Sequence, residues 1–310
     1  MPKFDVLVAG EINPDLILSG NVVPEFGQVE KLVESAMLAI GSSSAIFACG
    51  AARLGLKVAF IGVCGDDVFG RFMLDEMSKR QVDIENVIVS QSGSTGLSVI
   101  LNQPFDYAQG DRAILTHPGL IAELKASDIS DNLLRDSKHL HVASYFLQTN
   151  LQPDLPNLFR RAHALGLSTS LDTNYDPSEK WIGFDELLSV MNVFLPNEKE
   201  ALSLSGESNV DEAGSRLGSK VETLAIKLGA EGALGVSDGA RVRVASIPVN
   251  VIDTIGAGDS FDAGFIYGYL NQWSLEKSLR LACVCGALST QQAGGTNGQP
   301  TLEEAMSYDS

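Results

Sequence analysis

Short runs of apolar, often β-branched residues recur along the chain and alternate with stretches in which the apolar spacing is helical. The runs cover residues 4–9, 58–62, 139–142, 168–171, 193–195 and 223–226. Strands that are buried on both faces have such continuous apolar runs, and their alternation with helices is typical of parallel sheets. The pattern therefore predicts a three-layer α/β/α domain whose doubly wound, mostly parallel sheet lies between two layers of helices.

The hydrophobic pattern changes in two segments, residues 12–40 and 84–118, which lie before and after a predicted helix at 45–54. Short alternating stretches such as 97–101 and 113–116 replace the continuous runs there, and this alternation is typical of half-exposed strands. We expect a single domain over residues 1–310, from which the two segments project as a small antiparallel β-sheet that acts as a lid.

Composition narrows the class of protein. The chain has 310 residues, 45% of them hydrophobic, which is enough for a full core. A formal net charge of -17 repels nucleic-acid phosphate and anionic lipid, so we expect neither a nucleic-acid nor a membrane partner. Because no apolar run has the length of a signal sequence or a membrane span, the expected location is the cytoplasm.

The cysteines and histidines do not predict a metal site. The four cysteines lie in apolar contexts without C-x-x-C spacing, so we expect buried, reduced thiols. The four histidines show no ligand spacing, and H-E-x-x-H is absent. The residues concerned are Cys49, Cys64, Cys283, Cys285, His117, His139, His141 and His163.

A glycine-rich turn that leads into a helix is the most informative segment. Gly256 and Gly258 let backbone N–H groups converge, and the helix that follows adds unpaired N-terminal donors, so the turn should bind an anion such as phosphate. Asp259 lies in the first helical turn, where a carboxylate also serves as an ordinary cap or dipole partner. Beside an anion site it can instead accept the proton of a hydroxyl that attacks a bound phosphoryl group. Asp262 is expected to be solvated or capping and receives no role.

Other nucleotide motifs are missing. G-x-x-x-x-G-K-[ST] does not occur, the turn at 256–258 lacks the last glycine of G-x-G-x-x-G, and the first strand ends in the single Gly10. A Walker-type NTPase and an NAD-dependent dehydrogenase therefore both lose support.

Two segments resemble the signatures of the PfkB (ribokinase-like) carbohydrate kinase family. Residues 253–261, with the sequence DTIGAGDSF, are similar to its C-terminal signature, and residues 41–70 are similar to its N-terminal one. The resemblance covers nearly the whole chain. It implies a ribokinase-like fold and an ATP-dependent, Mg²⁺-dependent phosphotransferase with an alcohol group as acceptor.

The resemblance also implies roles for individual residues. Asp259 is the implied catalytic base, and Gly256, Ala257 and Gly258 form the implied anion hole. Asn197 and Glu200 match the family's N-x-x-E element, which orders phosphate and, through water, Mg²⁺. Without the family context, the same pair is typical of a helix start with a capping box.

Further positions are similar to the family's nucleotide-binding segments. They are Asn174, Lys227, Gly229, Gly232 and Asn297. Asp172 and Asp176, which flank Asn174, are interpreted as turn formers. Asp253 matches an aspartate that holds a monovalent cation, K⁺, in many relatives.

The implied acceptor site lies between the lid and the sheet. Asp15 matches the family aspartate that binds sugar hydroxyls, although a turn residue after Pro14 would look the same. Gly41, Ser42 and Ser43 match a second substrate element, in which serines also serve as helix caps. The usual asparagine of that element is Ile46 here, which cannot form a side-chain hydrogen bond, so ribose itself is a doubtful acceptor. Arg112 is expected to be solvated, with an acidic sugar as its alternative partner.

Three interpretations remain open: a sugar kinase, a nucleoside kinase of the same family, and a catalytically silent protein that binds sugar or nucleotide as a regulator. Asp259, Asn197 and Glu200 favour a kinase. The exposed edge and apolar face of a lid sheet often pair with a second copy, so we expect a homodimer formed through the lid.

Overall fold

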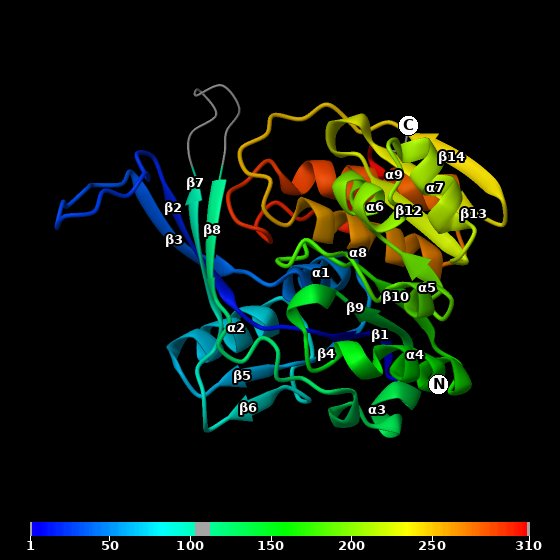
Figure 1. Cartoon of the computed structure of the whole chain (residues 1–310), viewed down its shortest axis with the longest axis horizontal. Coiled ribbons are helices and arrows are strands. Elements are labelled where there is room, and N and C mark those ends of the chain that lie inside the picture. The colour runs from blue at the N-terminus through cyan, green and yellow to red at the C-terminus, as the bar shows by residue number, and fades with distance from the viewer. Residues whose placement is uncertain (1, 103–111, 309–310) are drawn as a thin grey trace.

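The central element is a sheet of eight strands in the order β14-β13-β12-β11-β10-β9-β1-β4 (Figure 1). The computed structural model describes residues 2–102 and 112–308. Strands β4, β1, β9, β10, β11 and β12 pair in parallel, whereas β13 and β14 are antiparallel additions at one edge. Their bounds are β1 (Phe4–Ala9), β4 (Val58–Ile61), β9 (Ser137–Val142), β10 (Ser168–Leu171), β11 (Val193–Phe194), β12 (Thr223–Lys227), β13 (Ala233–Ser237) and β14 (Ala240–Val244).

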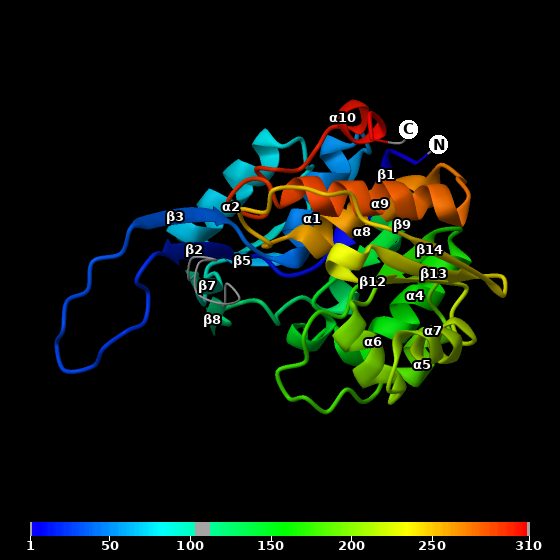
Figure 2. The ribbon, with the colours of Figure 1, turned by 90° about the horizontal axis from the view of Figure 1, so that it is seen from above.

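Helices cover both faces of this sheet, and Figure 2 shows the two helical layers on opposite sides. Alternate residues of β1 point to different layers, since Val6 and Val8 belong to one buried core and Leu7 and Ala9 to the other. The first layer contains α1 (Ser43–Arg53), α2 (Val68–Lys79), α8 (Ala257–Leu270), α9 (Leu275–Ser289) and α10 (Leu302–Met306). The second contains α3 (Asp131–Arg135), α4 (Leu155–Ala164), α5 (Asp185–Leu188), α6 (Glu198–Ser205) and α7 (Val210–Gly218). The predicted three-layer fold class is confirmed.

A second sheet of four strands projects from one side of the molecule, together with the long β2–β3 connection (Figures 1 and 2). Its order is β3-β2-β7-β8, with β2 (Pro14–Ser19), β3 (Ser35–Ile40), β7 (Leu97–Asn102) and β8 (Arg112–His117). The prediction of a purely antiparallel sheet was wrong, because the two antiparallel hairpins join through the parallel pair β2–β7. The part of the predicted lid at 103–111 lies outside the described residues.

Two further features were not predicted. β13 and β14 are hairpin strands at the sheet edge, and the exposed Arg241 and Arg243 interrupt the apolar pattern of β14. β5 (Val63–Gly65) and β6 (Ile88–Ser90) form a separate two-stranded parallel sheet, although residues 88–90 fall in the predicted lid range.

All four cysteines are buried and unpaired, as expected. Among the described residues, none of the helices has both the length and the hydropathy that a membrane span requires.

The turn before α8 is held by close backbone packing. Gly256, the N-cap of α8, has φ 72° and lies in the left-handed region. A Cβ at this position would lie 2.8 Å from the Cα atom of Gly295 and 2.9 Å from Ile46 Cγ2. Glycine is therefore required twice, for the backbone conformation and for the close approach of residue 295.

A column of polar side chains runs along β9 and β10, and all of its members except the half-buried Ser168 are buried. Ser168 pairs with His139 and Ser170 with His141 in the parallel register. Contacts of 2.7 Å join Ser168 Oγ to His139 Nδ1, His139 Nε2 to Ser170 Oγ, and Ser170 Oγ to His141 Nδ1. His141 stacks on Phe47, and its Nε2 atom has no hydrogen-bond partner among the described residues. Burial lowers the pKa of His139 to about 3 and the pKa of His141 well below its usual value, so both rings are neutral in the folded protein.

The substitution His141→Phe should make folding stability less sensitive to acid. The unfolded chain protonates this histidine below about pH 6.5, whereas the folded protein keeps it neutral, so it contributes stability at neutral pH that is lost as pH falls. For one such group the loss between pH 7.5 and pH 5.5 is about 1.4 kcal/mol. Denaturant unfolding at both pH values should show a correspondingly smaller loss in the variant. His117→Phe, which removes an exposed histidine of β8, is the control, and an unchanged pH dependence in His141→Phe would contradict the prediction.

Gly256→Ala should destabilise the fold more than a matched change elsewhere. Gly206, after α6, has φ 71°, but a Cβ there would meet nothing within 4 Å. Gly206→Ala should therefore lower the free energy of unfolding by about 1 kcal/mol, from backbone strain alone. Gly256→Ala should cost about 1–3 kcal/mol more, because the added methyl group meets the backbone of Gly295. Equal losses in denaturant unfolding would show that the close approach carries no cost.

Candidate active site

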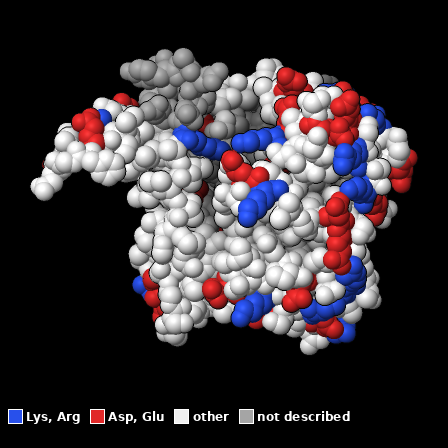
Figure 3. Space-filling model, in the orientation of Figure 1, with Lys and Arg blue, Asp and Glu red and all other residues white. Residues whose placement is uncertain are grey.

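The chemistry-bearing side chains gather where the parallel strands end. Asp172 follows β10, Asn197 follows β11, and Lys227 ends β12, so all three lie at the carboxyl edge of the sheet. This edge is where open α/β folds bind ligands. In Figure 3 acidic and basic side chains are exposed in the hollow between the lid and the main body.

Two cavities meet at the start of α8. The first has a volume of about 530 Å³ and lies between the lid and the sheet edge, and the second has about 580 Å³ and lies beside α8 and α9. Gly258 lines both, and Asp259 lines the first. The described residues that line both cavities are Lys227, Gly229, Thr254 and Gly258. An anion bound at the turn would therefore be accessible from both sides.

Asp15 forms the polar end of the first cavity. Its side chain is buried, and Asn13 Nδ2 lies 3.5 Å from Asp15 Oδ1 and 3.4 Å from Ser98 Oγ. Burial raises the pKa of Asp15 to about 7, and the charge of Arg112 opposes this rise. A Cβ on Gly41 would lie 2.2 Å from Asp15 Oδ1, so glycine leaves room for the carboxylate. Arg112 is exposed, as expected, and also lines this cavity.

The start of α1 forms one wall of the same cavity. Ser42 is the N-cap: its Oγ accepts a hydrogen bond from Ala45 N at 3.0 Å and donates to Glu11 O at 2.6 Å. The capping interpretation therefore fits Ser42. Both serines line the cavity, and Ser43 forms a hydrogen bond with the amide of Asn174. Ile46 also lines the cavity and presents only apolar atoms to it.

Asn174 lies just beyond β10 with φ 53°. Its amide nitrogen, oriented toward Asp172, donates to Asp172 Oδ2 at 3.1 Å, and its oxygen accepts from Ser144 Oγ at 2.9 Å. This network fixes Asn174 at the floor of the cavity. Asp176 is a turn former, as expected, since its carboxylate accepts hydrogen bonds from the backbone N–H groups of Ser178 and Trp181 at 2.8 Å.

Lys227 lies between two buried carboxylates. Its Nζ is 2.8 Å from Asp172 Oδ2 and 3.1 Å from both oxygens of Asp262. The expectation that Asp262 is solvated or capping was wrong, because α8 directs its side chain, 1% exposed, toward the sheet edge. Asp172 also does more than form a turn, since the ammonium group lowers the pKa of its buried carboxyl, against the effect of burial.

Asp259 is buried beside this group and lines the first cavity. Burial, with the negative charge of Asp172, raises the pKa of Asp259 well above its usual value, and Lys227 opposes the rise. Asp259 is therefore a stronger proton acceptor, when ionised, than a solvated aspartate.

Asn197 and Glu200 form a capping box at the start of α6. Glu200 Oε2 accepts from Asn197 N at 2.9 Å, and Glu200 Oε1 accepts from Asn197 Nδ2 at 2.6 Å. Burial raises the pKa of Glu200 to about 7, and Asp172 adds to the rise. Both residues line the first cavity. Nearby, carboxylate oxygens of Asp172, Asp259 and Asp262 lie within 4.8 Å of one another, and such oxygens are the ligands that Mg²⁺ prefers.

Of the remaining predicted site residues, some line a cavity and others do not. Gly229 and Gly232 line the second cavity. Asn297 lines neither cavity, and its side chain donates to Ala293 O at 2.9 Å. Asp253 is buried and also lines neither, because its oxygens accept from Ile255 N at 3.0 Å and Gly294 N at 2.9 Å.

Glu11 is a site residue that the sequence interpretation missed. Its buried carboxylate lines the first cavity and accepts hydrogen bonds from Ser44 Oγ at 2.6 Å and Ser144 Oγ at 2.8 Å, so it connects the segments that follow β1 and β9 to α1. Its place two residues after the end of β1, at the edge of the sheet where open α/β folds bind ligands, was the available signal.

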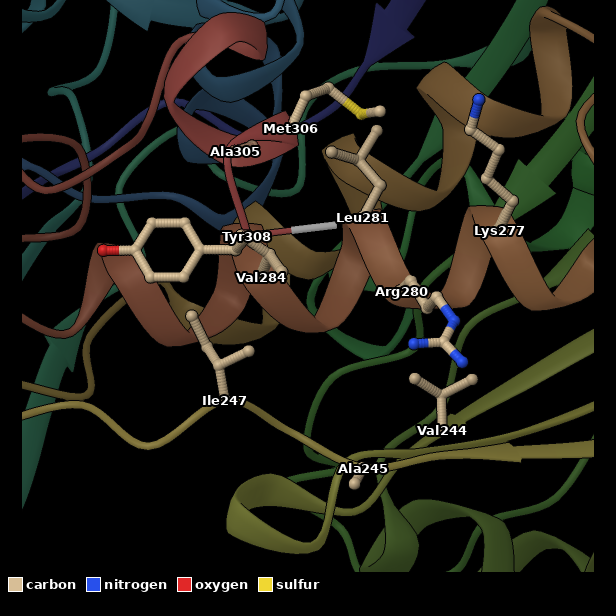
Figure 4. A pocket seen from close by; sticks show the side chains of 10 residues that line it. All are labelled: Val244, Ala245, Ile247, Lys277, Arg280, Leu281, Val284, Ala305, Met306 and Tyr308. Carbon is tan, nitrogen blue, oxygen red and sulfur yellow. The ribbon is translucent and has the colours of Figure 1, made fainter. Parts of the chain in front are cut away.

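A third cavity, of about 50 Å³, lies between β14, α9 and α10 (Figure 4). Its two basic residues are engaged elsewhere. Lys277 Nζ lies 3.8 Å from the ring centre of Trp273, and Arg280 Nη2 lies 2.9 Å from Glu276 Oε1. We interpret this cavity as a packing space.

Comparisons with known proteins identify the family of this chain. A family model for pfkB family carbohydrate kinases matches residues 5–302. An uncharacterized sugar kinase from Archaeoglobus fulgidus is 31% identical over 81% of this chain and 98% of its own length. Ribokinase from Haemophilus influenzae is 28% identical over 97% of both chains. The crystal structure of adenosine kinase from Sinorhizobium meliloti superposes with a TM-score of 0.85 at 26% identity, covering 99% of this chain and 100% of that one. The chain therefore belongs to the pfkB family of carbohydrate kinases.

Proposed function

We propose that this protein transfers the γ-phosphoryl group of ATP to a hydroxyl of a small sugar or sugar derivative. The observation that carries the proposal is that two cavities of similar size meet at the glycine-rich start of α8. An acceptor in the first and a nucleotide in the second would bring attacking and leaving oxygens to opposite sides of one phosphoryl group. The sugar kinases among its relatives support a sugar acceptor.

In this proposal Asp259 is the general base. It accepts the proton of the acceptor hydroxyl while the N–H groups of residues 256–258 and the N-terminus of α8 bind the negative charge of the phosphoryl group. Bound Mg²⁺ would neutralise phosphate charge, and Asn197 and Glu200 would hold it through water. Asp253 is the proposed ligand of a monovalent cation, K⁺.

The acceptor is proposed to bind between Asp15 and the anion-binding turn. A carboxylate is a suitable hydrogen-bond acceptor for sugar hydroxyls. Gly41 gives that carboxylate its space, and Ser43 adds a hydroxyl on the same wall. On the nucleotide side, Gly229 and Gly232 shape the second cavity, whose apolar wall includes Val249 and Phe261.

A nucleoside acceptor is the second candidate. Ile46, Ile100, Ile114, Ile121 and Leu147 line the first cavity, and such apolar surface can cover a base. The similarity to an adenosine kinase points the same way. The two candidates share the mechanism and differ only in the acceptor.

An ADP-release assay with Mg²⁺ and ATP tests the function. The acceptor panel should contain pentoses, hexoses, keto-deoxy sugar acids and nucleosides, and we expect one class to give turnover well above the rate without acceptor. Asp259→Asn removes the proton acceptor at nearly constant size, so it should lower kcat by roughly a hundredfold or more with little change in nucleotide affinity.

Two outcomes would contradict this proposal. Near-normal turnover in Asp259→Asn would remove Asp259 from the role of base. Silence across the whole panel, with ATP still stabilising the protein in a thermal-shift experiment, would favour the regulatory interpretation.

We also propose that two copies pair through the lid sheet. β8 is an edge strand, and its Leu115 is 63% exposed. Exposed apolar edge strands pair readily with a second copy. Light scattering over a concentration series should give the mass of a dimer, and a monomer throughout would contradict the proposal. Leu115→Lys should shift the equilibrium toward monomer, because it places like charges at the interface.

A further inference from the structure

The ion-pair group of Lys227, Asp172 and Asp262 joins three different elements. Lys227 is the last residue of β12, Asp172 follows β10, and Asp262 lies in α8. The side chains are 11%, 3% and 1% exposed, respectively, so the contacts are shielded from solvent. The three residues are far apart in the sequence, so only the fold brings their side chains into contact.

The ammonium group lies directly at the anion-binding turn. A Cβ built on Gly258 would be 3.6 Å from Lys227 Nζ, so the amine contacts the space beside the turn's backbone. Of the four described residues that line both cavities, Lys227 is the only one with a charged side chain. A phosphoryl group held by the turn would therefore meet this cation from either cavity.

Stability alone is a poor explanation for the group. Burying an ion pair costs desolvation that its mutual attraction often fails to offset, and apolar replacements are commonly neutral or stabilising. Here one ammonium group is shared by two buried carboxyl groups, with a third, that of Asp259, nearby. That arrangement instead fixes the direction of a long, flexible side chain, whose ordering would otherwise cost free energy at the moment of reaction.

We propose that Asp262 is a positioning residue for phosphoryl transfer: together with Asp172 it holds the Lys227 ammonium at the junction of the two cavities, where that ammonium stabilises the transferred phosphoryl group. This inference rests on the proposed kinase activity. It gives Asp262 no contact with substrate, and all of its effect passes through Lys227. The competing assignment is a metal ligand, because oxygens of Asp172, Asp259 and Asp262 lie within 4.8 Å of one another.

A double-mutant cycle separates these assignments. Lys227→Met should lower kcat by about a hundredfold with the nucleotide KM changed less than about threefold, because the lost interaction belongs to the transition state. Asp262→Asn should lower kcat by roughly tenfold, again with little change in KM. The double variant should be no slower than Lys227→Met, since Asp262 acts only through the lysine.

Asp176→Asn is the control, because it alters another buried carboxylate that only caps a loop. It should leave kcat near the wild-type value. Thermal unfolding of every variant shows that it is folded, and Lys227→Arg, which keeps the charge, replaces Lys227→Met if the latter does not fold. In that case the single variant Lys227→Arg should be more active than the double variant that combines Lys227→Arg with Asp262→Asn.

Three results would overturn the inference. Independent losses that multiply in the double variant would show that Asp262 does not act through Lys227. A roughly tenfold higher Mg²⁺ requirement in Asp262→Asn, with kcat restored at saturating Mg²⁺, would make Asp262 a metal ligand. Wild-type kcat in Asp262→Asn would remove its role altogether. If the kinase assignment itself fails, no protein of the set turns over and both proposals fall. Turnover by the wild type and by Asp176→Asn therefore distinguishes the three results above from that failure.

Discussion

The ion pairs of the buried Lys227 ammonium group are the interactions on which the rest of the site depends. They connect the ends of β10 and β12 to α8, and these three elements surround the junction of the two cavities. Without the cation, Asp172 and Asp262 would face each other in a buried environment, where unpaired like charges are costly. The parallel sheet supplies the geometry, since it brings the ends of neighbouring strands to one edge, and the lysine supplies the charge that lets carboxylates gather there.

The glycine turn adds a second constraint, of shape. Gly256 has a left-handed conformation and packs closely against Gly295, and both features fix the course of the backbone at the start of α8. The segment at 294–295 is in turn held by Asp253, whose carboxylate accepts from Gly294 N. One carboxylate therefore links the beginning of the turn to the loop that packs on it.

Sequence patterns predicted the structural features that depend on residues close together in the sequence. Apolar runs located six central strands, and the capping box at Asn197 and Glu200 follows from local spacing. They did not predict contacts between distant segments. Lys227 meets Asp262 across 35 positions and Asp172 across 55, and nothing local to Asp262 distinguishes a solvated aspartate from a buried one. The parallel pairing of β2 and β7 was missed for the same reason, because alternation identifies a strand but not the direction of its partner.

Ile46 shows how one residue can serve packing and selectivity together. Its side chain fills the space beside the turn, since a Cβ on Gly295 would lie 2.5 Å from Ile46 Cδ1, and it also lines the first cavity. An asparagine could occupy similar volume and offer hydrogen bonds to an acceptor, whereas isoleucine offers none. An acceptor hydroxyl placed against Ile46 would lose its solvent partner without replacement, at a cost of about 1–3 kcal/mol. Under the proposed kinase activity, the position would therefore favour an acceptor that presents an apolar edge to α1 and directs its hydroxyls toward Asp15 and Asp259.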